Sequence, residues 1–386
     1  MKVLMATLSL HLSGQSVYIR NLGKGLIARG HEVIVATGNL ARGKPLGVEY
    51  FQREGMSVIE FSVGNLEGGM PSFATASLKN GLRMRQMLND IQPDVVHVHA
   101  VTLGAQVQVA RLMARRRPGL VTTLHNQSIS PKKQMLGRLA CAASREALGS
   151  SVIAISTDMS RMLAREIGID RSLIRVISPS ADDAYFSPPT PAQRAAARKR
   201  LGVADHEVGI CCVALLNPRK NQSRLVSAVG QLFRRGLPVR LLLAGDDPQA
   251  YGQQLRELAE RENCLSVVRL LGFNDPREVY WASDINVLVS IEEGFGLVVT
   301  EAALTGLPSL RSRSAGAEDQ IAHGQNGLLV DAQDQEAMAA ELERLVTCAS
   351  FRTKMGESAA QIARQKFSLE AMARAIESAY FDAMVR

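Results

Sequence analysis

The sequence predicts an α/β protein made of two doubly wound domains, each built on a largely parallel sheet. Short apolar, β-branched segments alternate with longer amphipathic segments from one end of the chain to the other. Such alternation requires crossover connections between parallel strands, with helices on both faces of the sheet. The length of 386 residues, 46% of them hydrophobic, is enough for two domains with separate cores.

The first half begins with an apolar segment at 2–8 that could pass for a signal peptide. It has no small-residue cleavage site and is soon interrupted by His11, so we interpret it as a buried first strand. Further β-branched runs predict strands at 32–37, 57–62, 94–99, 120–124, 152–155 and 174–177. The amphipathic segments between them predict helices at 17–29, 74–90, 103–115 and 157–167.

The second half repeats this scheme after a proline-rich segment. Strands are expected at 208–215, 239–244, 267–272, 285–289, 307–310 and 327–330. Helices are expected at 223–234, 250–262, 297–305, 335–347, 351–366 and 369–384. Four of the 14 prolines fall within 178–191, which predicts a hinge because proline ends regular structure. The expected division is a first domain at 1–178, a linker at 179–191, a second domain at 192–366 and a final helix at 367–386 that returns to the first domain.

Composition and charge restrict the environment and the partners. There is no apolar run of about 18 residues, so no transmembrane helix is expected. Five scattered cysteines without a Cys-x-x-Cys pair argue against a disulfide framework and favour a cytoplasmic protein.

Residues 1–186 carry a net charge of +9 and residues 187–386 a net charge of −1. The excess favours an acidic partner such as anionic lipid, a phosphorylated substrate or nucleic acid, unless these are ordinary solvated arginines. Nucleic acid is disfavoured because no aromatic residues are interleaved with the charges.

The most informative segment is Ser290-Ile-Glu-Glu-Gly-Phe-Gly-Leu-Val-Val-Thr-Glu301, where a strand is followed by a glycine-containing turn and a helix. The free N–H groups of Phe295, Gly296 and Leu297 would point out of the helix start and attract an anion. Glu293 before the helix and Glu301 about one turn inside it suit the recognition of sugar hydroxyls. The alternative is an acidic helix entry with Glu301 on a solvated face.

Basic and histidine residues follow other predicted strands. Arg219 and Lys220 come directly after the first strand of the second half and could neutralise a pyrophosphate, or could be exposed loop residues. His97 and His99 alternate along one strand and so face one side of it. They favour a structural role or an acceptor contact over a metal site, because no third ligand is nearby. His125 taken alone is more typical of a hydrogen-bonded loop residue than of a catalytic group.

These motifs together resemble the retaining glycosyltransferases of family 4, which have the GT-B fold. The resemblance is carried by Glu293-Gly-Phe-Gly-Leu-Val-Val-Thr-Glu301, a Glu-x7-Glu motif, and by four further segments of the second half at 244–248, 268–273, 282–290 and 323–330. The first half matches more loosely, at 13–15, 29–33, 93–99 and 122–125, and the hinge matches at 182–188.

The resemblance implies a role for each matching residue. Glu301 would bind the ribose of a nucleotide and Glu293 the hydroxyls of the donor sugar. The diphosphate would be held by Lys220 and by the amides of Phe295, Gly296 and Leu297.

The remaining roles fall on both halves of the chain. Gly14 would lie against the phosphates and sugar, His125 beside the anomeric carbon, and Phe273 near the base. No bound metal or other cofactor is implied, in agreement with the absence of an Asp-x-Asp motif in the second half.

The chain departs from the family pattern in two places. Leu215 stands where the family usually has an arginine that clamps the diphosphate, and Arg219 is the candidate replacement. The first loop has Gly14-Gln15 in place of a glycine pair.

The expected activity is metal-independent transfer of a hexose-type sugar, with retention, from a nucleoside diphosphate sugar to an acceptor hydroxyl. The sequence leaves uridine, guanosine and adenosine diphosphate donors open, and a uridine diphosphate donor is favoured on family frequency alone. The acceptor, a small molecule, a glycan or a glycolipid, would be selected by the segments 39–48, 64–72 and 126–133. The alternatives are a sugar-nucleotide epimerase or a phosphorylase on the same fold, and a basic module that binds a membrane surface or nucleic acid.

Overall fold

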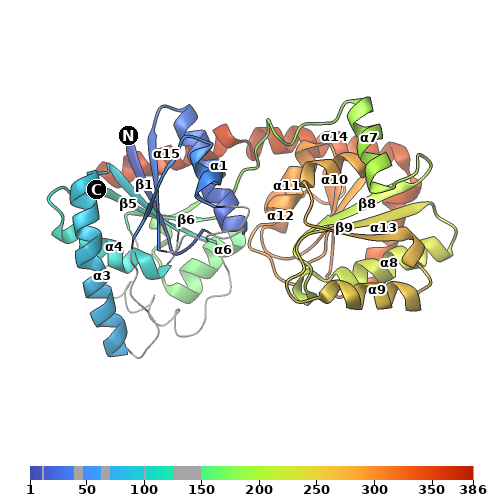
Figure 1. The fold of residues 1–386 in the computed structure, drawn as a ribbon, viewed down its shortest axis with the longest axis horizontal. Coiled ribbons are helices and arrows are strands. Elements are labelled where there is room, and N and C mark those ends of the chain that lie inside the picture. Colours follow the sequence, from blue (N-terminus) through green and yellow to red (C-terminus); the bar gives the residue numbers. More distant parts are fainter. Residues whose placement is uncertain (11–12, 39–46, 62–69, 100, 126–148, 386) are drawn as a thin grey trace. The chain divides into compact units, whose positions relative to one another are not determined.

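A computed structural model describes residues 1–10, 13–38, 47–61, 70–99, 101–125 and 149–385 of the chain. The chain divides into two compact units. The first contains Met1–Ser180 together with Leu369–Arg386, and the second contains Ala181–Ser368. Each unit is built on one sheet, and the described strands of both sheets pair in parallel (Figure 1). The predicted fold class, two parallel-sheet α/β domains, is confirmed.

The first unit contains a seven-stranded sheet in the order β3-β2-β1-β4-β5-β6-β7. Its strands are β1 (Lys2–Thr7), β2 (Glu32–Thr37), β3 (Ser57–Glu60), β4 (Val95–Val98), β5 (Gly119–Leu124), β6 (Ser151–Ala154) and β7 (Ile174–Val176). β1 is buried from Val3 to Thr7, as expected of a first strand enclosed by its neighbours. The register pairs Val3 with Val33 of β2 and with Val95 of β4, so the aliphatic residues of three strands stack in one layer.

Helices of the first unit include segments from both ends of the chain. They are α1 (Gly14–Ala28), α2 (Val48–Gln52), α3 (Met70–Ile91), α4 (Val101–Met113), α6 (Thr157–Met162) and α15 (Leu369–Val385). A π-helical turn (Leu163–Ile167) continues α6, and a 3₁₀ turn (Arg171–Leu173) precedes β7. The final helix α15 is fixed to this unit by Glu377, which accepts hydrogen bonds from Arg29 at 2.6 Å and pairs with His31 at 2.7 Å.

The second unit contains a six-stranded sheet in the order β10-β9-β8-β11-β12-β13. Its strands are β8 (Val208–Val213), β9 (Val239–Ala244), β10 (Val268–Gly272), β11 (Ile285–Leu288), β12 (Ser309–Ser312) and β13 (Gly327–Val330). Cys211 and Cys212 are buried in β8, where they are small residues of the core.

Helices follow most strands of the second unit. They are α7 (Pro191–Leu201), α8 (Gln222–Arg234), α9 (Tyr251–Arg261), α10 (Pro276–Ala282), α11 (Leu297–Leu304), α12 (Ala317–Gln320), α13 (Gln335–Thr347) and α14 (Ala349–Lys366). Two 3₁₀ turns, Pro218–Lys220 and Leu265–Val267, complete it. Trp281 on α10 is 9% exposed and donates from its indole nitrogen to the Ser187 carbonyl at 3.0 Å, so it packs in the interior of this unit.

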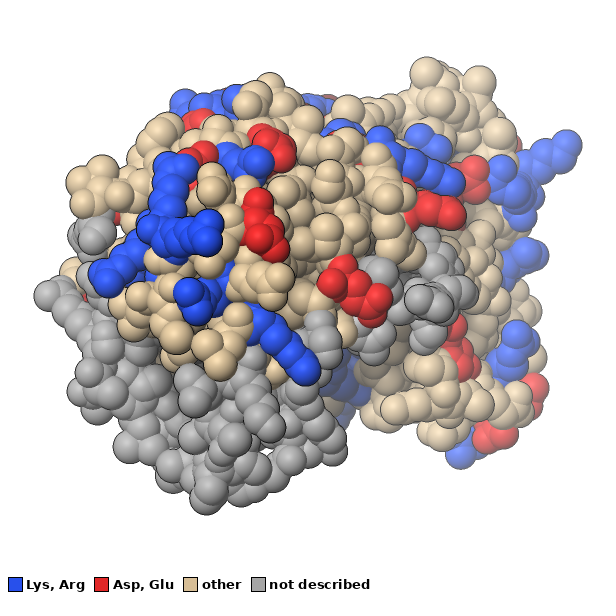
Figure 2. Space-filling model, turned by 60° about the vertical axis from the view of Figure 1, so that its left-hand side comes forward, with Lys and Arg blue, Asp and Glu red and all other residues tan. Residues whose placement is uncertain are grey.

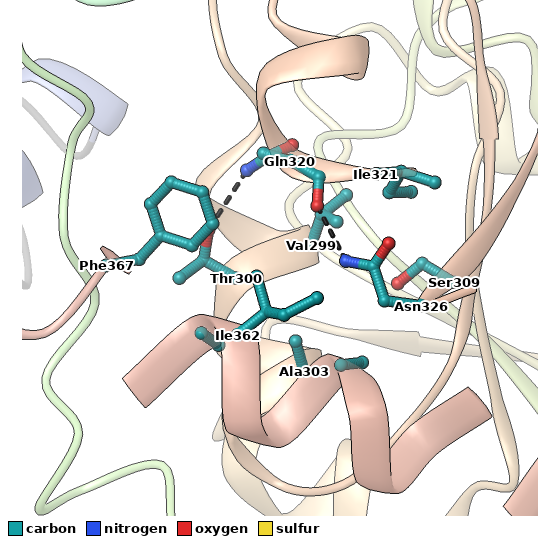
Figure 3. Close-up of a pocket in the computed structure, with 11 residues that line it drawn as sticks. Val299, Thr300, Ala303, Ser309, Gln320, Ile321, Asn326, Ile362 and Phe367 are labelled. Carbon is teal, nitrogen blue, oxygen red and sulfur yellow. Dashed lines mark hydrogen bonds between the residues drawn. The ribbon is translucent and has the colours of Figure 1, made fainter. Parts of the chain in front are cut away.

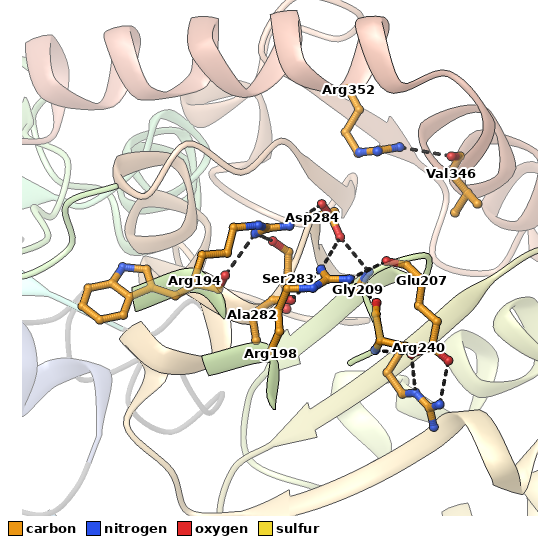
Figure 4. Close-up of polar contacts among 12 residues, drawn as sticks. Arg194, Arg198, Glu207, Gly209, Arg240, Ala282, Ser283, Asp284, Val346 and Arg352 are labelled. Atoms are coloured by element: carbon orange, nitrogen blue, oxygen red, sulfur yellow. Dashed lines mark hydrogen bonds and ion pairs between the residues drawn. The ribbon is translucent and has the colours of Figure 1, made fainter. Parts of the chain in front are cut away.

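Helix α7 was not predicted, because it begins inside the proline-rich segment. Thr190 and Gln193 form a reciprocal capping box, and Pro191 occupies the first helical position, where a missing N–H is harmless. Figure 4 shows how this helix is held to the sheet: Arg194 and Arg198 both bind the carboxylate of Asp284, at 2.7 and 3.1 Å. Asp284 also accepts from the Gly209 amide at 2.8 Å, so one carboxylate connects α7, β8 and the start of β11.

The strand order of each sheet identifies where a ligand would bind. In an open parallel sheet, ligands occupy the crevice at the carboxyl ends of the strands, where the strand order reverses. This switch point lies between β1 and β4 in the first unit and between β8 and β11 in the second.

Candidate functional site

The loops after β8 and β11 meet at the switch point of the second sheet. After β8, Asn217 accepts a hydrogen bond from the Lys220 amide at 3.1 Å and so fixes a single 3₁₀ turn. The Ile291 amide donates to the Arg219 carbonyl at 2.9 Å, and Asn221 donates to the Val289 carbonyl at 3.1 Å. These contacts join the loop after β8 to the loop after β11. They bring Lys220 of the first loop close to Glu293 of the second.

Lys220 and Glu293 form an ion pair in this place, with Lys220 14% and Glu293 9% exposed. Ser290 donates a second hydrogen bond to the same carboxylate, at 2.8 Å. Ser312 on β12 in turn donates to the Ser290 carbonyl at 2.6 Å, which anchors this end of the loop to the sheet. Lys220 was predicted to bind the diphosphate of a donor and Glu293 its sugar. The structure places these two side chains in direct contact.

The start of α11 presents free backbone amides. Gly296 precedes the helix with φ of +78°, a conformation that favours glycine, and no side chain caps the helix. Among the described residues, no backbone acceptor is found for the amides of Phe295, Gly296 and Leu297. The Phe295 ring is buried against the Phe367 ring, with 5.8 Å between centroids, and holds the loop down. The helix start thus has the properties of an anion site.

Glu301 lies on α11 and is buried, so the alternative of a solvated face does not apply. The Tyr280 hydroxyl on α10 donates to its Oε2 atom at 2.9 Å. Burial raises the pKa of Glu301 to about 7, while the hydrogen bond from Tyr280 lowers it. Near neutral pH this carboxyl group is therefore close to its point of half-ionisation.

Two other predicted residues lie on the surface at the same end of the sheet. Phe273 follows β10 and is 60% exposed. Arg219 is exposed, and its guanidinium lies 3.4 Å from the Glu292 carbonyl. Leu215, at the position where an arginine was expected, is 40% exposed after β8.

The first unit places its predicted residues at the carboxyl ends of β1, β4 and β5, at or beside its own switch point. His125 follows β5 and His99 follows β4, and the Nδ1 atom of His99 lies 3.1 Å from Nε2 of His125. The Tyr18 ring contacts both imidazoles edge-on, with centroid distances of 5.7 and 4.8 Å. Gly14 is exposed at the start of α1.

The neighbouring His97 is completely buried and has a structural environment. Its ring nitrogens lie 2.7 Å from the Tyr380 hydroxyl on α15 and 2.6 Å from the Thr123 hydroxyl on β5. Burial lowers the pKa of His97 and of His125 to about 3, and the pKa of His99 falls well below its ordinary value for the same reason. Among the described residues, no group of three histidine, cysteine or acidic side chains is arranged to hold a metal ion.

The predicted positive charge lies on the surface of the first unit. Figure 2 shows lysine and arginine side chains on the face turned toward the viewer, with acidic side chains among them. Exposed arginines occur near the end of α3 and beyond α4, where the Arg115 amide donates to Asn89 of α3 at 2.8 Å. Arg116 is paired with Asp94. The segments expected to select an acceptor, 39–48, 64–72 and 126–133, lie wholly or largely outside the described residues.

Comparison with known proteins places this chain in a family. Residues 193–362 match the model for glycosyl transferases group 1, and residues 12–185 match the model for glycosyltransferase family 4. The D-inositol 3-phosphate glycosyltransferase of Corynebacterium glutamicum is 30% identical, over 96% of this chain and 92% of that protein. The chain belongs to glycosyltransferase family 4. It is therefore a glycosyltransferase, and the predicted resemblance is confirmed.

Other relatives agree with this assignment. The D-inositol 3-phosphate glycosyltransferase of Corynebacterium efficiens is also 30% identical, over 96% of this chain and 90% of that protein. A glycosyltransferase from Rickettsia africae has a similar structure, with a TM-score of 0.85, 21% identity and coverage of 99% and 98%. Anabaena HepE in complex with UDP and glucose has a TM-score of 0.81 at 23% identity, with 98% of each chain covered. The fold of this glycosyltransferase is GT-B.

Sequence reasoning missed several residues around the site. Tyr280 precedes its partner by 21 positions, and nothing in the sequence connects the two. Ser290 begins the segment 290–301 but is not among the predicted site residues, although a hydroxyl before two glutamates is a candidate hydrogen-bond donor. Among the described residues, no helix is long and apolar enough to cross a bilayer.

Proposed function

We propose that this glycosyltransferase moves a hexose-type sugar from a uridine diphosphate sugar to an acceptor hydroxyl, with retention at the anomeric carbon and without a metal ion. The observation that carries the proposal is the meeting of an ammonium group, a carboxylate and the free amides of a helix start at one switch point, with a second, buried carboxylate on the same helix. Lys220 and the start of α11 suit the diphosphate, Glu293 the sugar and Glu301 the ribose.

The proposed mechanism of sugar transfer follows from where negative charge develops as the donor is cleaved. Cleavage of the bond between the anomeric carbon and the β-phosphate oxygen leaves negative charge on the diphosphate. Preorganised amides and an ammonium group stabilise that charge, with a contribution of a few kcal/mol each in comparable sites. The acceptor oxygen then bonds to the same face of the sugar, and its proton passes to the departing phosphate oxygen. No side-chain nucleophile is required.

The choice of a uridine diphosphate donor is supported by the ligands of a protein with the same fold. One structure with the same fold holds UDP and glucose, and these are the ligands of that protein. The positive groups of the second unit could balance the diphosphate without a metal ion. Transfer that persists in excess chelator would support metal independence, and recovery only on addition of a divalent cation would contradict it.

We further propose that the acceptor is a phosphorylated polyol of the inositol phosphate type. Several relatives are named for D-inositol 3-phosphate, at 26 to 30% identity. The net charge of +9 on residues 1–186 would attract such an anion. Transfer to inositol phosphates but not to free inositol would support this acceptor class. Transfer only to a glycan or to a lipid in vesicles would replace it.

A binding screen followed by product analysis tests the proposal. Nucleoside diphosphates should raise the melting temperature, since ligand at 100 times its dissociation constant adds about 2.7 kcal/mol of stability. With donor and acceptor present, NMR coupling constants of the product should show the anomeric configuration of the donor. An inverted product would exclude retention. Conversion of the donor to an isomer without acceptor would indicate an epimerase, and a requirement for inorganic phosphate would indicate a phosphorylase.

A further inference from the structure

β12 carries an arginine whose side chain is completely buried. Arg311 is 0% exposed and is the largest of the fully buried side chains among the described residues. It donates to the Ala315 carbonyl at 2.7 Å, to the Gly316 carbonyl at 3.2 Å and to the side-chain oxygen of Gln320. A buried guanidinium is costly to desolvate, so its place inside the second unit requires an explanation.

The acceptors of Arg311 connect it to the start of α11. Gln320 donates to the Gly296 carbonyl at 3.2 Å and to the Thr300 hydroxyl at 2.9 Å. Figure 3 shows the bond to Thr300 and a further bond that Asn326 donates to the Gln320 carbonyl at 2.8 Å. The Gln320 side chain is therefore held between the arginine and the first turn of the helix.

The guanidinium also lies directly behind the loop that precedes α11. A Cβ atom placed on Gly296 would be 3.5 Å from the Arg311 Cζ atom. A Cβ atom on Gly316, whose carbonyl binds the arginine, would be 3.2 Å from the Phe295 Cα atom. Arg311 thus lies on the buried side of the loop whose amides are proposed to hold the diphosphate.

We propose that Arg311 is a positioning residue of the diphosphate site: its buried positive charge adds to the potential at the start of α11, and its contact with Gln320 holds the Gly296 peptide so that the amides face outward. This rests on the proposed function, because it assumes that a diphosphate binds there. Charges act strongly at short range in a medium of low dielectric constant, so a fixed cation behind the amides attracts phosphate without touching it.

Calorimetry with uridine, UMP and UDP tests the proposal. The neutral nucleoside does not respond to the charge, whereas UDP responds most. Arg311→Met should weaken UDP binding by 10- to 100-fold, UMP binding less, and uridine binding by less than twofold. Arg313→Met is the matched control, because Arg313 is half-exposed and paired with Glu318 at 3.3 Å. It should leave all three affinities within twofold.

A second variant keeps the test decisive if Arg311→Met does not fold. Gln320→Glu retains the arginine and places a carboxylate against it, which cancels its field with almost no change in volume. It should also reduce UDP affinity relative to uridine. An unchanged ratio of UDP to uridine affinity in a folded variant would overturn the proposal, as would an equal loss for both ligands. If the natural protein binds neither ligand, the proposed function itself fails.

Discussion

Lys220 and Glu293 are 73 positions apart in the sequence, yet they form an ion pair where the strand order of the second sheet reverses. The pair joins the loop after β8 to the loop after β11. Both groups are largely buried, so removal of either leaves a charge with little solvent around it. A diphosphate that binds Lys220 must compete with Glu293, and a sugar that binds Glu293 must compete with Lys220.

The first prediction separates the two members of this pair. Glu293→Gln removes the competing carboxylate, so we expect UDP to bind at least as tightly as in the natural protein. Transfer should slow by about 100-fold, because the sugar loses a charged acceptor for its hydroxyls. Calorimetry and turnover measure the two effects. Glu292→Gln, at an exposed neighbouring position, should change neither. Tenfold weaker UDP binding in Glu293→Gln would show that the ion pair does not compete with the ligand.

The second prediction concerns the pH dependence of binding through Glu301. Only the ionised carboxylate accepts two ribose hydroxyls, and the pKa of Glu301 is raised to about 7. Uridine affinity should therefore rise with pH through 7 and fall by up to tenfold per unit below it. Uridine is the appropriate probe because it carries no phosphate that titrates. Calorimetry between about pH 5.5 and 8.5 measures the profile. Glu301→Gln is the control and should give a flat profile, because glutamine does not titrate. A flat profile in the natural protein would contradict the assigned ribose contact.

The third prediction follows from the bond that Tyr280 donates to Glu301. Tyr280→Phe removes a donor that stabilises the ionised form, so the pKa of Glu301 should rise further above its ordinary value. The midpoint of the uridine profile should move to higher pH, while affinity well above the midpoint changes little. Phe retains the ring volume in the core, which makes the substitution a test of the hydroxyl alone. Tyr251→Phe, on α9, is the control and should leave the midpoint unchanged.

Most of the architecture could be predicted from the sequence because the strands are short aliphatic runs and the helices are long and amphipathic. The helix at 335–347 was predicted at both ends, since Asp334 caps it and its apolar residues recur with helical spacing. Helices α2, α10 and α12 were missed because they are four to seven residues long and carry no periodic signal. Helix α7 was missed because proline was interpreted only as a breaker.

The site was predictable as a set of residues but less so as a set of contacts. The Glu-x7-Glu spacing identified Glu293 and Glu301, but their partners Lys220 and Tyr280 come from other elements. Arg311 was hidden for a different reason. The strand was predicted to end at 310, whereas β12 extends through Ser312 and encloses Arg311, a residue type that is almost never fully buried.

The fourth prediction concerns the acid stability of the first unit. The pKa values of His97 and His125 are lowered to about 3 by burial, and that of His99 is lowered well below the ordinary value of 6.5. Unfolded histidines therefore bind protons that the folded unit excludes, so stability is complete above pH 6.5 and is lost as the pH falls. Each histidine contributes up to about 1.4 kcal/mol per pH unit.

Calorimetric unfolding between pH 7 and 5 measures this loss. The single tryptophan, Trp281, lies in the second unit, so its fluorescence reports that unit separately. The transition of the first unit should move to lower temperature first. His97→Asn should reduce the pH slope by about a third, since one of three histidines no longer titrates. His206→Gln, at an exposed position, should leave it unchanged. Equal slopes for the two units would count against the histidine cluster as the cause.

The last prediction compares two glycines at opposite ends of α11. Gly296 and Gly306 both have a positive φ, +78° and +91°, so alanine at either position should cost about 1 to 2 kcal/mol of stability. Only Gly296 is confined, because its added Cβ atom would lie 2.8 Å from a methyl group of Leu288, whereas nothing lies within 4 Å of that on Gly306. The added methyl group at 296 must displace the loop that carries the proposed diphosphate amides. UDP affinity should therefore fall by at least tenfold in Gly296→Ala and stay within twofold in Gly306→Ala. Equal affinities in the two variants would mean that this loop does not hold the diphosphate.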